Sequence, residues 1–548
     1  MKPHNGALAG GKRLSLPLWQ AGLALVAGVG QAASLSWPLA NGLFAQQMGL
    51  QYGQPVWWLP LLSLGLLAWL LDGWRHTALA RGARQAWRPA AWLGGLFATA
   101  WLAGTFWWIF IALHTYGGLP ALLSIVAVIT LAALLAIYYA AICAAFVALA
   151  PVQPAQAAII FACLWLLAEL ARGVWLTGFG WGAVAYAQLN GPLIAYVPWI
   201  GMYGVCLVVA WWVMTLAQGV RWRGSRVASV LAVAALVAPQ VGGAPWVSTT
   251  SAGRLDVTLL QGNIPQDEKF EPGSGVPLAL KWYHEQLLAS QTSLVIAPET
   301  AIPLLPQQLR PDYWQDLQTR FATGEQAALL GMPLGDMDAG YTNSVVGFQP
   351  GRGELWRYDK QHLVPFGEFI PPLFKWFTQM MNIPLGDFNR GAKKQPLFDW
   401  KGQRLALNIC YEDLFGEELG LQFSDPAQSP TVFVNVSNLA WFGESLAMDQ
   451  HLHIARMRAL EFARPFVLAT NTGTTAIVDH QGRVTSSLAR GTRGALVTEV
   501  EGRDGVTPFA AWVARFGLWP YWGLIGIVLS LAAWSAWRKR QTGFIHRP

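Results

Sequence analysis

Long apolar runs fill most of the first 245 residues, and short segments with polar or basic residues separate them. A helix needs about 20 apolar residues to cross the roughly 30 Å hydrocarbon core of a bilayer, and each run approaches or exceeds that length. The pattern therefore predicts seven membrane-spanning helices, of which the last is marginal. They are expected near residues 17–34, 55–72, 91–113, 119–149, 156–172, 194–217 and 226–241.

Two segments of this membrane part depart from a simple span. The run at 119–149 is longer than a crossing needs, so we expect it to tilt or to extend beyond the bilayer. Residues 35–54 are mixed in character, and we expect a re-entrant or interfacial segment there.

From about residue 246 the pattern changes to short apolar runs that alternate with amphipathic stretches such as 277–290 and 311–323. This alternation predicts an α/β domain with a buried sheet, and it ends near residue 508. A last apolar run at 519–537 predicts an eighth span. The strand-like runs are Arg254–Gly262, Ser293–Glu299, Ala327–Gly331, Asn343–Phe348, Leu405–Cys410 and Thr431–Val436.

The sequence thus predicts three parts. They are a membrane domain with seven helices at 1–245, an α/β domain at 246–508, and a C-terminal span with a basic tail at 509–548. Composition agrees, because the chain is 54% hydrophobic and only 12% charged. Ordinary globular proteins carry about 25% charged residues.

The net charge of +7 could also indicate a nucleic-acid partner. The basic residues, however, cluster in short segments beside apolar runs, which is the pattern of membrane topology. Lys2, Lys12 and Arg13 precede the first run, so a cleaved signal peptide is an alternative to a retained span. No convincing small-residue cleavage site follows, and a retained first span is therefore favoured.

Every basic loop falls on one side of the predicted membrane. The segments without Lys or Arg, 35–54 and 114–118, fall on the other side. Because positive residues mark the cytoplasmic side, both termini are expected in the cytoplasm and the α/β domain outside. The basic residues are Arg75, Arg81, Arg84 and Arg88 after the second span, Arg221, Arg223 and Arg226 after the sixth, and Arg538, Lys539 and Arg540 in the tail.

Three of the four cysteines, Cys143, Cys163 and Cys206, lie in apolar spans and are expected to be small buried residues. Cys410 is the only cysteine of the outer domain, so it has no partner there for a disulfide. It is either a buried structural cysteine or a nucleophile that needs a base and a positive charge from elsewhere in the domain.

Glu299 and Lys360 also follow strand-like runs, LVIAP and LWRYD, just as Cys410 follows LALNI. Loops at strand ends hold reactive groups on a rigid frame. Glu299 could accept the proton of an attacking thiol, while Lys360 and the backbone N–H after Cys410 could stabilise the oxyanion. Taken singly, Glu299 also fits a surface acid and Lys360 a solvated lysine.

Four motifs, PETAIP (298–303), YDKQHLVPFGEFIP (358–371), NICYED (408–413) and SNLAWFG (437–443), resemble the nitrilase-type carbon–nitrogen hydrolase superfamily. That superfamily has an αββα sandwich and a Glu–Lys–Cys triad. Further motifs, HIARMRALEFARP (453–465), ELARGVWLTGFGW (169–181) and YAQLNGP (186–192), are similar to the bacterial apolipoprotein N-acyltransferase family, its membrane-embedded branch. The resemblance covers nearly the whole chain.

The resemblance implies that Glu299 is the general base, Lys360 the oxyanion stabiliser and Cys410 the nucleophile. Glu368 is expected to support the lysine, and Glu412 to assist the site.

Tyr411 is expected to contribute its backbone N–H, whereas Trp441 and Phe442 belong to an aromatic loop that contacts the acyl chain or the substrate. Phe270 stands where the family pattern leads us to expect tryptophan, which puts one lid contact in doubt.

The implied reaction moves a fatty acyl chain from a membrane phospholipid, through a Cys410 thioester, to the α-amino group of the N-terminal diacylglyceryl-cysteine of an apolipoprotein. The implied location is the bacterial inner membrane with a periplasmic catalytic domain. We expect a monomer, no nucleic acid and no cofactor. A metal site is not expected, because His451 and His453 do not share a helix face and no further ligands cluster with them.

Two alternatives stay open on sequence alone. A membrane-anchored amidase or nitrilase-type hydrolase would use the same triad and let water resolve the thioester, but it would need only one anchor. A transporter would need ionisable residues deep in its spans, and the mid-span positions are almost free of charge. Glu169 and Arg172 lie near an outer helix end and are interpreted as interface residues beside the active site.

Overall fold

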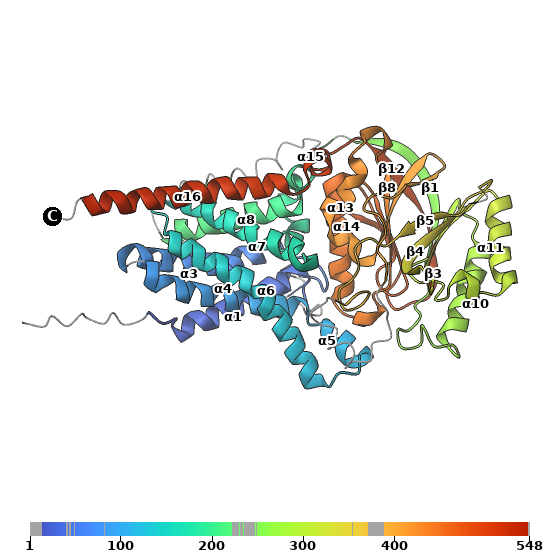
Figure 1. Cartoon of the computed structure of the whole chain (residues 1–548), viewed down its shortest axis with the longest axis horizontal. Helices are drawn as coiled ribbons and strands as arrows, with labels where there is room; N and C mark the ends of the chain where they lie inside the picture. Colours follow the sequence, from blue (N-terminus) through green and yellow to red (C-terminus); the bar gives the residue numbers. More distant parts are fainter. Residues whose placement is uncertain are drawn as a thin grey trace, which may run out of the picture.

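The computed structural model of the chain describes residues 14–545, apart from 40, 41, 43, 44, 46, 49, 82, 222–229, 231–233, 235–246, 248, 353 and 371–387. A bundle of long helices and a two-sheet α/β domain lie end to end (Figure 1). The predicted span at 226–241 falls almost wholly outside the described residues.

The bundle is built from long, mostly apolar helices. In the described ranges, four helical segments are long and apolar enough to cross a membrane, namely 18–35, 121–149, 154–177 and 192–221. Two bent pairs, α4 with 109–116 and α15 with α16, raise that number to six. The long helices are α1 (Leu18–Leu35), α3 (Leu59–Arg81), α4 (Ala83–Thr105), α6 (Ala121–Leu149), α7 (Pro154–Val174), α8 (Val197–Arg221) and α16 (Trp519–Ile545).

Helix α3 covers the predicted span at 55–72, but it carries Asp72 and Arg75 and is not among those six segments. The eight predicted spans are therefore confirmed only in part. Cys143, Cys163 and Cys206 are buried, as expected for small residues of the spans.

Short helical turns gather at the end of the bundle that faces the α/β domain. The partly described segment 35–54 also lies there, since His453 Nε2 donates to the Gly53 carbonyl oxygen at 2.8 Å. The turns are α5 (Ile109–Ile111), the π-helical turn Ala112–Tyr116, and the 3-10 turns Trp175–Thr177, Val184–Asn190 and Pro192–Tyr196.

The α/β domain contains two six-stranded sheets with the orders β12-β1-β2-β3-β4-β5 and β11-β10-β9-β8-β7-β6. Strands β1, β2 and β3 run parallel, as do β7, β8 and β9, and the outer strands are antiparallel. The first sheet contains β1 (Thr250–Gln261), β2 (Leu294–Ile296), β3 (Ala327–Asp336), β4 (Gly340–Phe348), β5 (Trp356–Asp359) and β12 (Gly494–Asp504). The second contains β6 (Phe398–Trp400), β7 (Gln403–Ile409), β8 (Val432–Ser437), β9 (Phe466–Thr470), β10 (Ala476–Val478) and β11 (Val484–Ser487).

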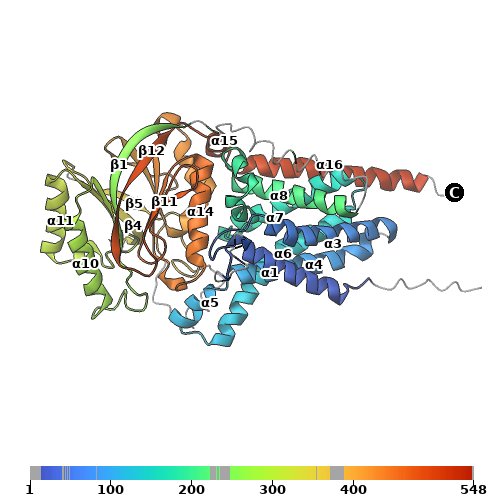
Figure 2. The ribbon, with the colours of Figure 1, turned by 180° about the vertical axis from the view of Figure 1, so that it is seen from behind.

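The two sheets pack face to face through side chains such as Val257, Leu329, Leu407 and Val434. Helices α10 (Gly275–Ala289) and α11 (Pro311–Thr323) cover the first sheet. Helices α13 (Gly416–Gly420), α14 (Ala447–Phe462) and α15 (Pro508–Phe516) lie on the side of the second (Figures 1 and 2). The central strands are buried on both faces, which explains their almost continuous apolar runs. The predicted α/β domain is confirmed as an αββα sandwich.

The core of the bundle continues into the α/β domain. Tyr411 and Phe415, just after β7, and Ile454 and Met457 of α14 belong to the same buried cluster as the membrane helices. The end of β7 therefore faces the bundle rather than solvent.

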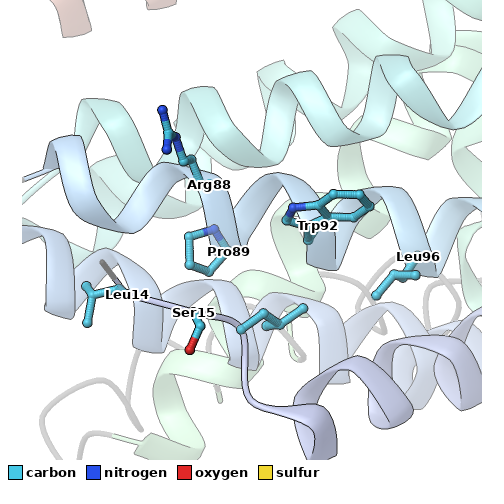
Figure 3. A pocket seen from close by; sticks show the side chains of 7 residues that line it. Leu14, Ser15, Arg88, Pro89, Trp92 and Leu96 are labelled. Carbon is cyan, nitrogen blue, oxygen red and sulfur yellow. The ribbon is translucent and has the colours of Figure 1, made fainter. Parts of the chain in front are cut away.

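The opposite end of the bundle carries basic side chains. Arg75 pairs with Asp72 at 2.8 Å and donates to the Pro151 carbonyl oxygen at 2.5 Å, and Arg221 lies 3.3 Å from Asp72. A groove of about 470 Å³ also lies toward this end, with Arg88 at its rim. Its lining residues are Leu14, Ser15, Leu16, Arg88, Pro89, Trp92 and Leu96 (Figure 3).

Candidate active site

Cys410 lies on a strained turn directly after β7. Its φ of 52° falls in the left-handed region, where a residue other than glycine costs roughly 1–2 kcal/mol. The 3-10 turn Cys410–Leu414 begins here and redirects the chain away from the sheet. Such strain persists only where the surrounding structure fixes it, and it concentrates at functional sites.

Glu412 fixes this turn from the side of the α/β domain. Its Oε2 accepts hydrogen bonds from Ile409 N at 2.6 Å and Tyr358 Oη at 2.8 Å. Its Oε1 accepts from Gln361 N at 2.6 Å and His362 N at 3.1 Å. The carboxylate thus ties the turn Cys410–Leu414 to the segment after Lys360, and its oxygens are occupied by these donors.

The neighbouring acid, Asp413, is also used inside the fold. Its Oδ2 lies 3.1 Å from Nε2 of His451 on α14, and both side chains are buried. Glu412 therefore has hydrogen-bond partners of its own, whereas burial raises the pKa of Asp413 well above its usual range and lowers the pKa of His451 to about 4.

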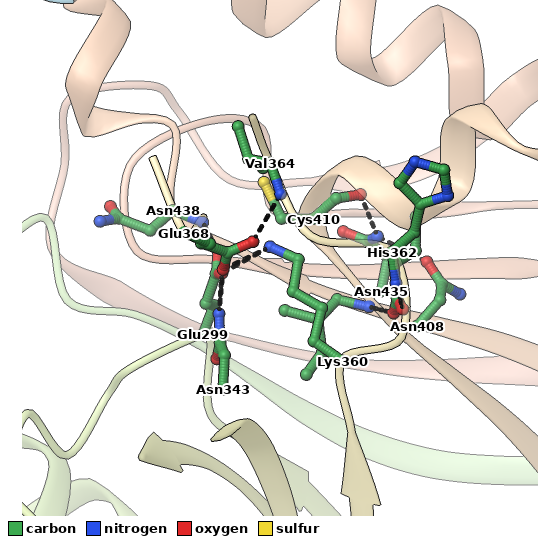
Figure 4. Close-up of polar contacts among 12 residues, drawn as sticks. Glu299, Asn343, Lys360, His362, Val364, Glu368, Asn408, Cys410, Asn435 and Asn438 are labelled. Carbon is green, nitrogen blue, oxygen red and sulfur yellow. Dashed lines mark hydrogen bonds and ion pairs between the residues drawn. The ribbon is translucent and has the colours of Figure 1, made fainter. Parts of the chain in front are cut away.

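Glu299, Lys360 and Glu368 converge on the space beside Cys410 (Figure 4). The Lys360 Nζ lies 2.9 Å from Glu368 Oε1 and 3.3 Å from Glu299 Oε1, and the lysine is only 1% exposed. The ends of β2, β5 and β7 bring Glu299, Lys360 and Cys410 together, as the sequence predicted (Figure 4). A buried ammonium between two carboxylates is held in one orientation.

Two asparagines that the sequence analysis did not single out orient the carboxylates. Asn343 Nδ2 donates to Glu299 Oε1 at 2.7 Å and to Glu368 Oε1 at 2.8 Å. The backbone N–H of Asn438 donates to Glu299 Oε2 at 2.9 Å. A polar residue at the start of the apolar run TNSVVGF was the available signal for Asn343, and Asn438 belongs to the quoted motif SNLAWFG.

Burial raises the pKa of the Cys410 thiol well above its usual range, and the Glu299 carboxylate raises this pKa further. The Lys360 ammonium acts in the opposite direction. Burial lowers the pKa of Lys360, but Glu299 and Glu368 outweigh it and the net pKa is raised. Lys360 therefore stays charged, while Cys410 is a thiol that would need a base to act as a nucleophile.

Comparisons with known proteins agree with this geometry. Residues 256–504 match the family model of carbon-nitrogen hydrolases, and residues 44–215 match that of the apolipoprotein N-acyltransferase N-terminal domain. The chain is 53% identical over 526 residues to an apolipoprotein N-acyltransferase of Verminephrobacter eiseniae. The aligned part covers 91% of this chain and 94% of the relative. The chain belongs to the apolipoprotein N-acyltransferase family.

Other members of the apolipoprotein N-acyltransferase family are also similar over most of their length. One from Ralstonia nicotianae is 40% identical, with 94% of this chain and 97% of the relative covered. One from Bordetella bronchiseptica is 39% identical, with 87% and 94% covered.

A second lysine, Lys269, also lies beside Glu299, and the sequence analysis did not identify it. Lys269 is 2% exposed, and its Nζ donates to the carbonyl oxygen of Glu299 at 3.2 Å. Burial lowers the pKa of Lys269 to about 8, against the opposing influence of Glu299 and Cys410. Its neighbour Phe270 is about half exposed.

The predicted aromatic loop lies where the α/β domain meets the bundle. Phe442 contacts Trp108 with ring centroids 4.3 Å apart, and Trp441 contacts Tyr116 at 5.9 Å. Both partners belong to the turn region that follows α4. The bundle and the α/β domain thus supply this aromatic cluster together.

The pair Glu169 and Arg172 is more deeply buried than the sequence suggested. Both side chains are inaccessible to solvent, and Arg172 Nη2 donates to Glu169 Oε2 at 2.7 Å. They lie at the end of α7 that faces the active site, as predicted. They are inside the bundle rather than on its surface, because the loop after α7 folds back over them.

Proposed function

We propose that this member of the apolipoprotein N-acyltransferase family carries a fatty acyl chain as a thioester on Cys410. The donor is a membrane phospholipid, and the acceptor is the α-amino group of the N-terminal diacylglyceryl-cysteine of an apolipoprotein. The observation that carries the proposal is a buried Glu299–Lys360–Glu368 cluster beside a cysteine on a strained turn, at the end of a membrane bundle. Both substrates carry acyl chains that stay in a bilayer, so the site has to open at the membrane surface.

In the first half-reaction, Cys410 Sγ attacks the ester carbonyl carbon of the phospholipid while Glu299 accepts the thiol proton. Lys360 Nζ and the backbone N–H of Tyr411 stabilise the oxyanion that forms. The carbon–oxygen bond to glycerol then breaks, Glu299 returns its proton to the leaving oxygen, and lysophospholipid departs. The acyl chain remains on sulfur.

In the second half-reaction, the neutral α-amino group of the acceptor attacks the thioester carbonyl carbon. Glu299 accepts a proton from the nitrogen, and the same donors stabilise the oxyanion. The carbon–sulfur bond breaks, the amide product forms, and the proton passes from Glu299 to the Cys410 thiolate. The enzyme returns to its starting state without a cofactor.

In this mechanism the supporting residues orient the reacting groups and the substrates. Glu368 and Glu299 receive two of the three N–H groups of Lys360, which leaves the third for the oxyanion. Glu412 holds the nucleophile turn. Trp441 and Phe442 would contact the acyl chain or the acceptor, because their apolar rings stand at the junction with the bundle.

We further propose the membrane arrangement that the basic residues predict: a monomer in the bacterial inner membrane, with both termini cytoplasmic and the α/β domain periplasmic. In its support, Arg75 and Arg221 pair with Asp72 near the C-terminal ends of α3 and α8, and Arg88 is near the start of α4. These helix ends lie remote from the α/β domain (Figure 1). Helix α8 ends at that remote end and β1 begins at the other, so the chain has to return between them. This favours the seventh of the eight spans and the division at about 245 and 508.

Mass spectrometry of the purified protein after incubation with a synthetic phospholipid of defined acyl chains tests the proposal. We expect a mass increase of one acyl chain in the wild type and in Cys206→Ala, a buried cysteine of the bundle, and no increase in Cys410→Ala. A diacylated lipopeptide with a free N-terminal diacylglyceryl-cysteine should then discharge the adduct and gain the chain on nitrogen.

The same experiment separates acyl transfer from hydrolysis. If the adduct on Cys410 decays only to free fatty acid in the presence of lipopeptide, the enzyme is a hydrolase. If the wild type forms no adduct, Cys410 is not the nucleophile and the proposal is wrong.

A further inference from the structure

The side chain of Arg172 holds the loop that follows α7 through hydrogen bonds to its backbone. The guanidinium donates from Nη1 to the carbonyl oxygens of Phe179 at 2.6 Å and Trp181 at 2.7 Å. It also donates from Nη2 to Glu169 at 2.7 Å and from Nε to the Tyr139 hydroxyl at 2.9 Å. One side chain, 1% exposed, therefore connects two membrane helices to two points of this loop.

The same loop is strained immediately before the residues that Arg172 holds. Leu176, Thr177 and Gly178 have φ angles of 55°, 80° and 81° in succession, and only one of them is glycine. At Gly178, a Cβ atom would lie 2.1 Å from the carbonyl oxygen of Gly173. A loop with this backbone keeps its shape only while neighbouring groups fix it.

The loop also contacts the turn Cys410–Leu414, which we call the nucleophile turn, and the segment after Lys360. The hydroxyl of Tyr411 donates to the carbonyl oxygen of Gly178 at 2.8 Å, and His362 Nε2 donates to that of Thr177 at 2.9 Å. The indole of Trp181 donates to Gln450 Oε1 of α14 at 2.7 Å. Residues 177–181, which we call the latch loop, thus lie between Arg172 and the residue next to Cys410.

We propose that Arg172 is a positioning residue for acyl transfer: by fixing the latch loop it anchors Tyr411, and it thereby sets the backbone N–H that meets the oxyanion. The inference rests on the proposed thioester mechanism, in which that N–H is a donor. Glu412 fixes the turn from the α/β domain and Tyr411 fixes it from the bundle, so the strained Cys410 is held on both sides.

A purely structural role does not account for the choice of arginine. A buried ion pair in a membrane bundle is expensive, and an apolar pair of similar volume is often at least as stable. The planar fork of Arg172 holds two carbonyl oxygens and a carboxylate at once, which the single ammonium of lysine cannot reproduce.

The bundle contains a matched control at its remote end. Arg75 is equally buried, pairs with Asp72 at 2.8 Å, and donates to the carbonyl oxygens of Pro151 at 2.5 Å and Val152 at 3.3 Å. It holds the loop between α6 and α7, at the end of the bundle remote from the α/β domain. Arg75→Lys therefore imitates the loss of packing and charge geometry in Arg172→Lys without touching the latch loop.

The test compares Arg172→Lys, Arg75→Lys and Tyr411→Phe in the full-length protein in detergent with phospholipid. We expect thioester formation in a single turnover to slow by about tenfold to a hundredfold in Arg172→Lys and Tyr411→Phe, because a misaligned oxyanion donor acts on the transition state. Arg75→Lys should acylate at the wild-type rate. Alkylation of Cys410 by iodoacetamide needs a thiolate but no oxyanion donor, so it should stay within about twofold in all three variants.

The double variant Arg172→Lys/Tyr411→Phe decides whether Arg172 acts through Tyr411. If it does, the double variant should form the thioester no more slowly than the slower single variant, whereas the rate losses of independent residues would multiply. The inference is wrong if Arg75→Lys slows acylation as much as Arg172→Lys, if alkylation falls in parallel, or if the two effects multiply. Failure of the proposed function is distinguishable, because the wild type itself would then form no thioester.

Discussion

The hydroxyl of Tyr411 donates a hydrogen bond of 2.8 Å to the carbonyl oxygen of Gly178, which lies 233 positions earlier in the chain. Tyr411 follows Cys410, the proposed nucleophile, and Gly178 belongs to the loop that follows membrane helix α7. The bond therefore joins the reactive turn of a sandwich fold directly to the bundle. A sandwich domain without its bundle would lack one of the two anchors of this turn.

The pH dependence of Cys410 alkylation should respond in opposite directions to its two charged neighbours. The Glu299 carboxylate raises the pKa of the thiol, so Glu299→Gln should lower this pKa and shift the rise in alkylation rate to lower pH. The Lys360 ammonium lowers the same pKa, so Lys360→Met should shift the rise to higher pH. Both variants should lose acyl transfer. Iodoacetamide rates between pH 6 and about 10 measure the shifts, and equal profiles in both variants would contradict the electrostatic account.

Lys269→Met should make the protein more stable at neutral pH. Burial lowers the pKa of Lys269 to about 8, below the usual value for an unfolded chain, so the charged form is destabilising wherever it is populated. The unfolded chain binds more protons between about pH 8 and 10.5, so wild-type stability rises relative to the variant across that window, by about 3 kcal/mol in total.

Thermal unfolding in detergent at pH 7, 8.5 and 10 measures this difference. The advantage of Lys269→Met should be largest at pH 7 and should shrink as the pH rises. Lys281→Met, at an exposed position of α10, is the control and should show no such trend. A constant difference for Lys269→Met would mean that the ammonium carries no burial penalty.

Asn343→Leu should lower acyl transfer more than it lowers stability. Its amide donates to both Glu299 and Glu368, so its loss leaves two buried carboxylate oxygens with fewer donors and frees Lys360 to move between them. We expect a fall in the acylation rate of about tenfold to a hundredfold. Single-turnover thioester formation measures it. Asn389→Leu, which removes an exposed amide that donates to Ala339, is the matched control and should acylate normally.

Glu412→Gln should destabilise the nucleophile turn although it preserves the shape of the side chain. The carboxylate accepts four hydrogen bonds, and an amide would turn its own N–H groups toward two of those donors. We expect a loss of roughly 2–4 kcal/mol in unfolding free energy. Denaturation in detergent measures the loss. Glu418→Gln, a partly exposed acid beside His362, should cost much less.

The sequence alone determined the elements and the candidates for chemistry. Apolar run length marks a membrane helix, and short apolar runs such as Ser293–Glu299 and Leu405–Cys410 mark buried strands, because these signals are local in the chain. A carboxylate, a lysine and a cysteine directly after such strands could be recognised as one set, since strand ends place their loops together. The resemblance in motifs then supplied their expected roles.

The tertiary structure decided which further groups meet this set. Asn343 and Lys269 look unremarkable in the sequence, because their roles depend on partners that are 25 to 44 positions away. Arg172 was expected beside the active site, but its hold on the loop after α7 depends on how that loop folds back over it. The link from Arg172 through the latch loop to Tyr411 exists only when the sandwich packs on the bundle. Local periodicity fixes what a segment becomes, whereas side-chain hydrogen bonds between distant segments depend on how those segments pack, and no pattern along the chain encodes them directly.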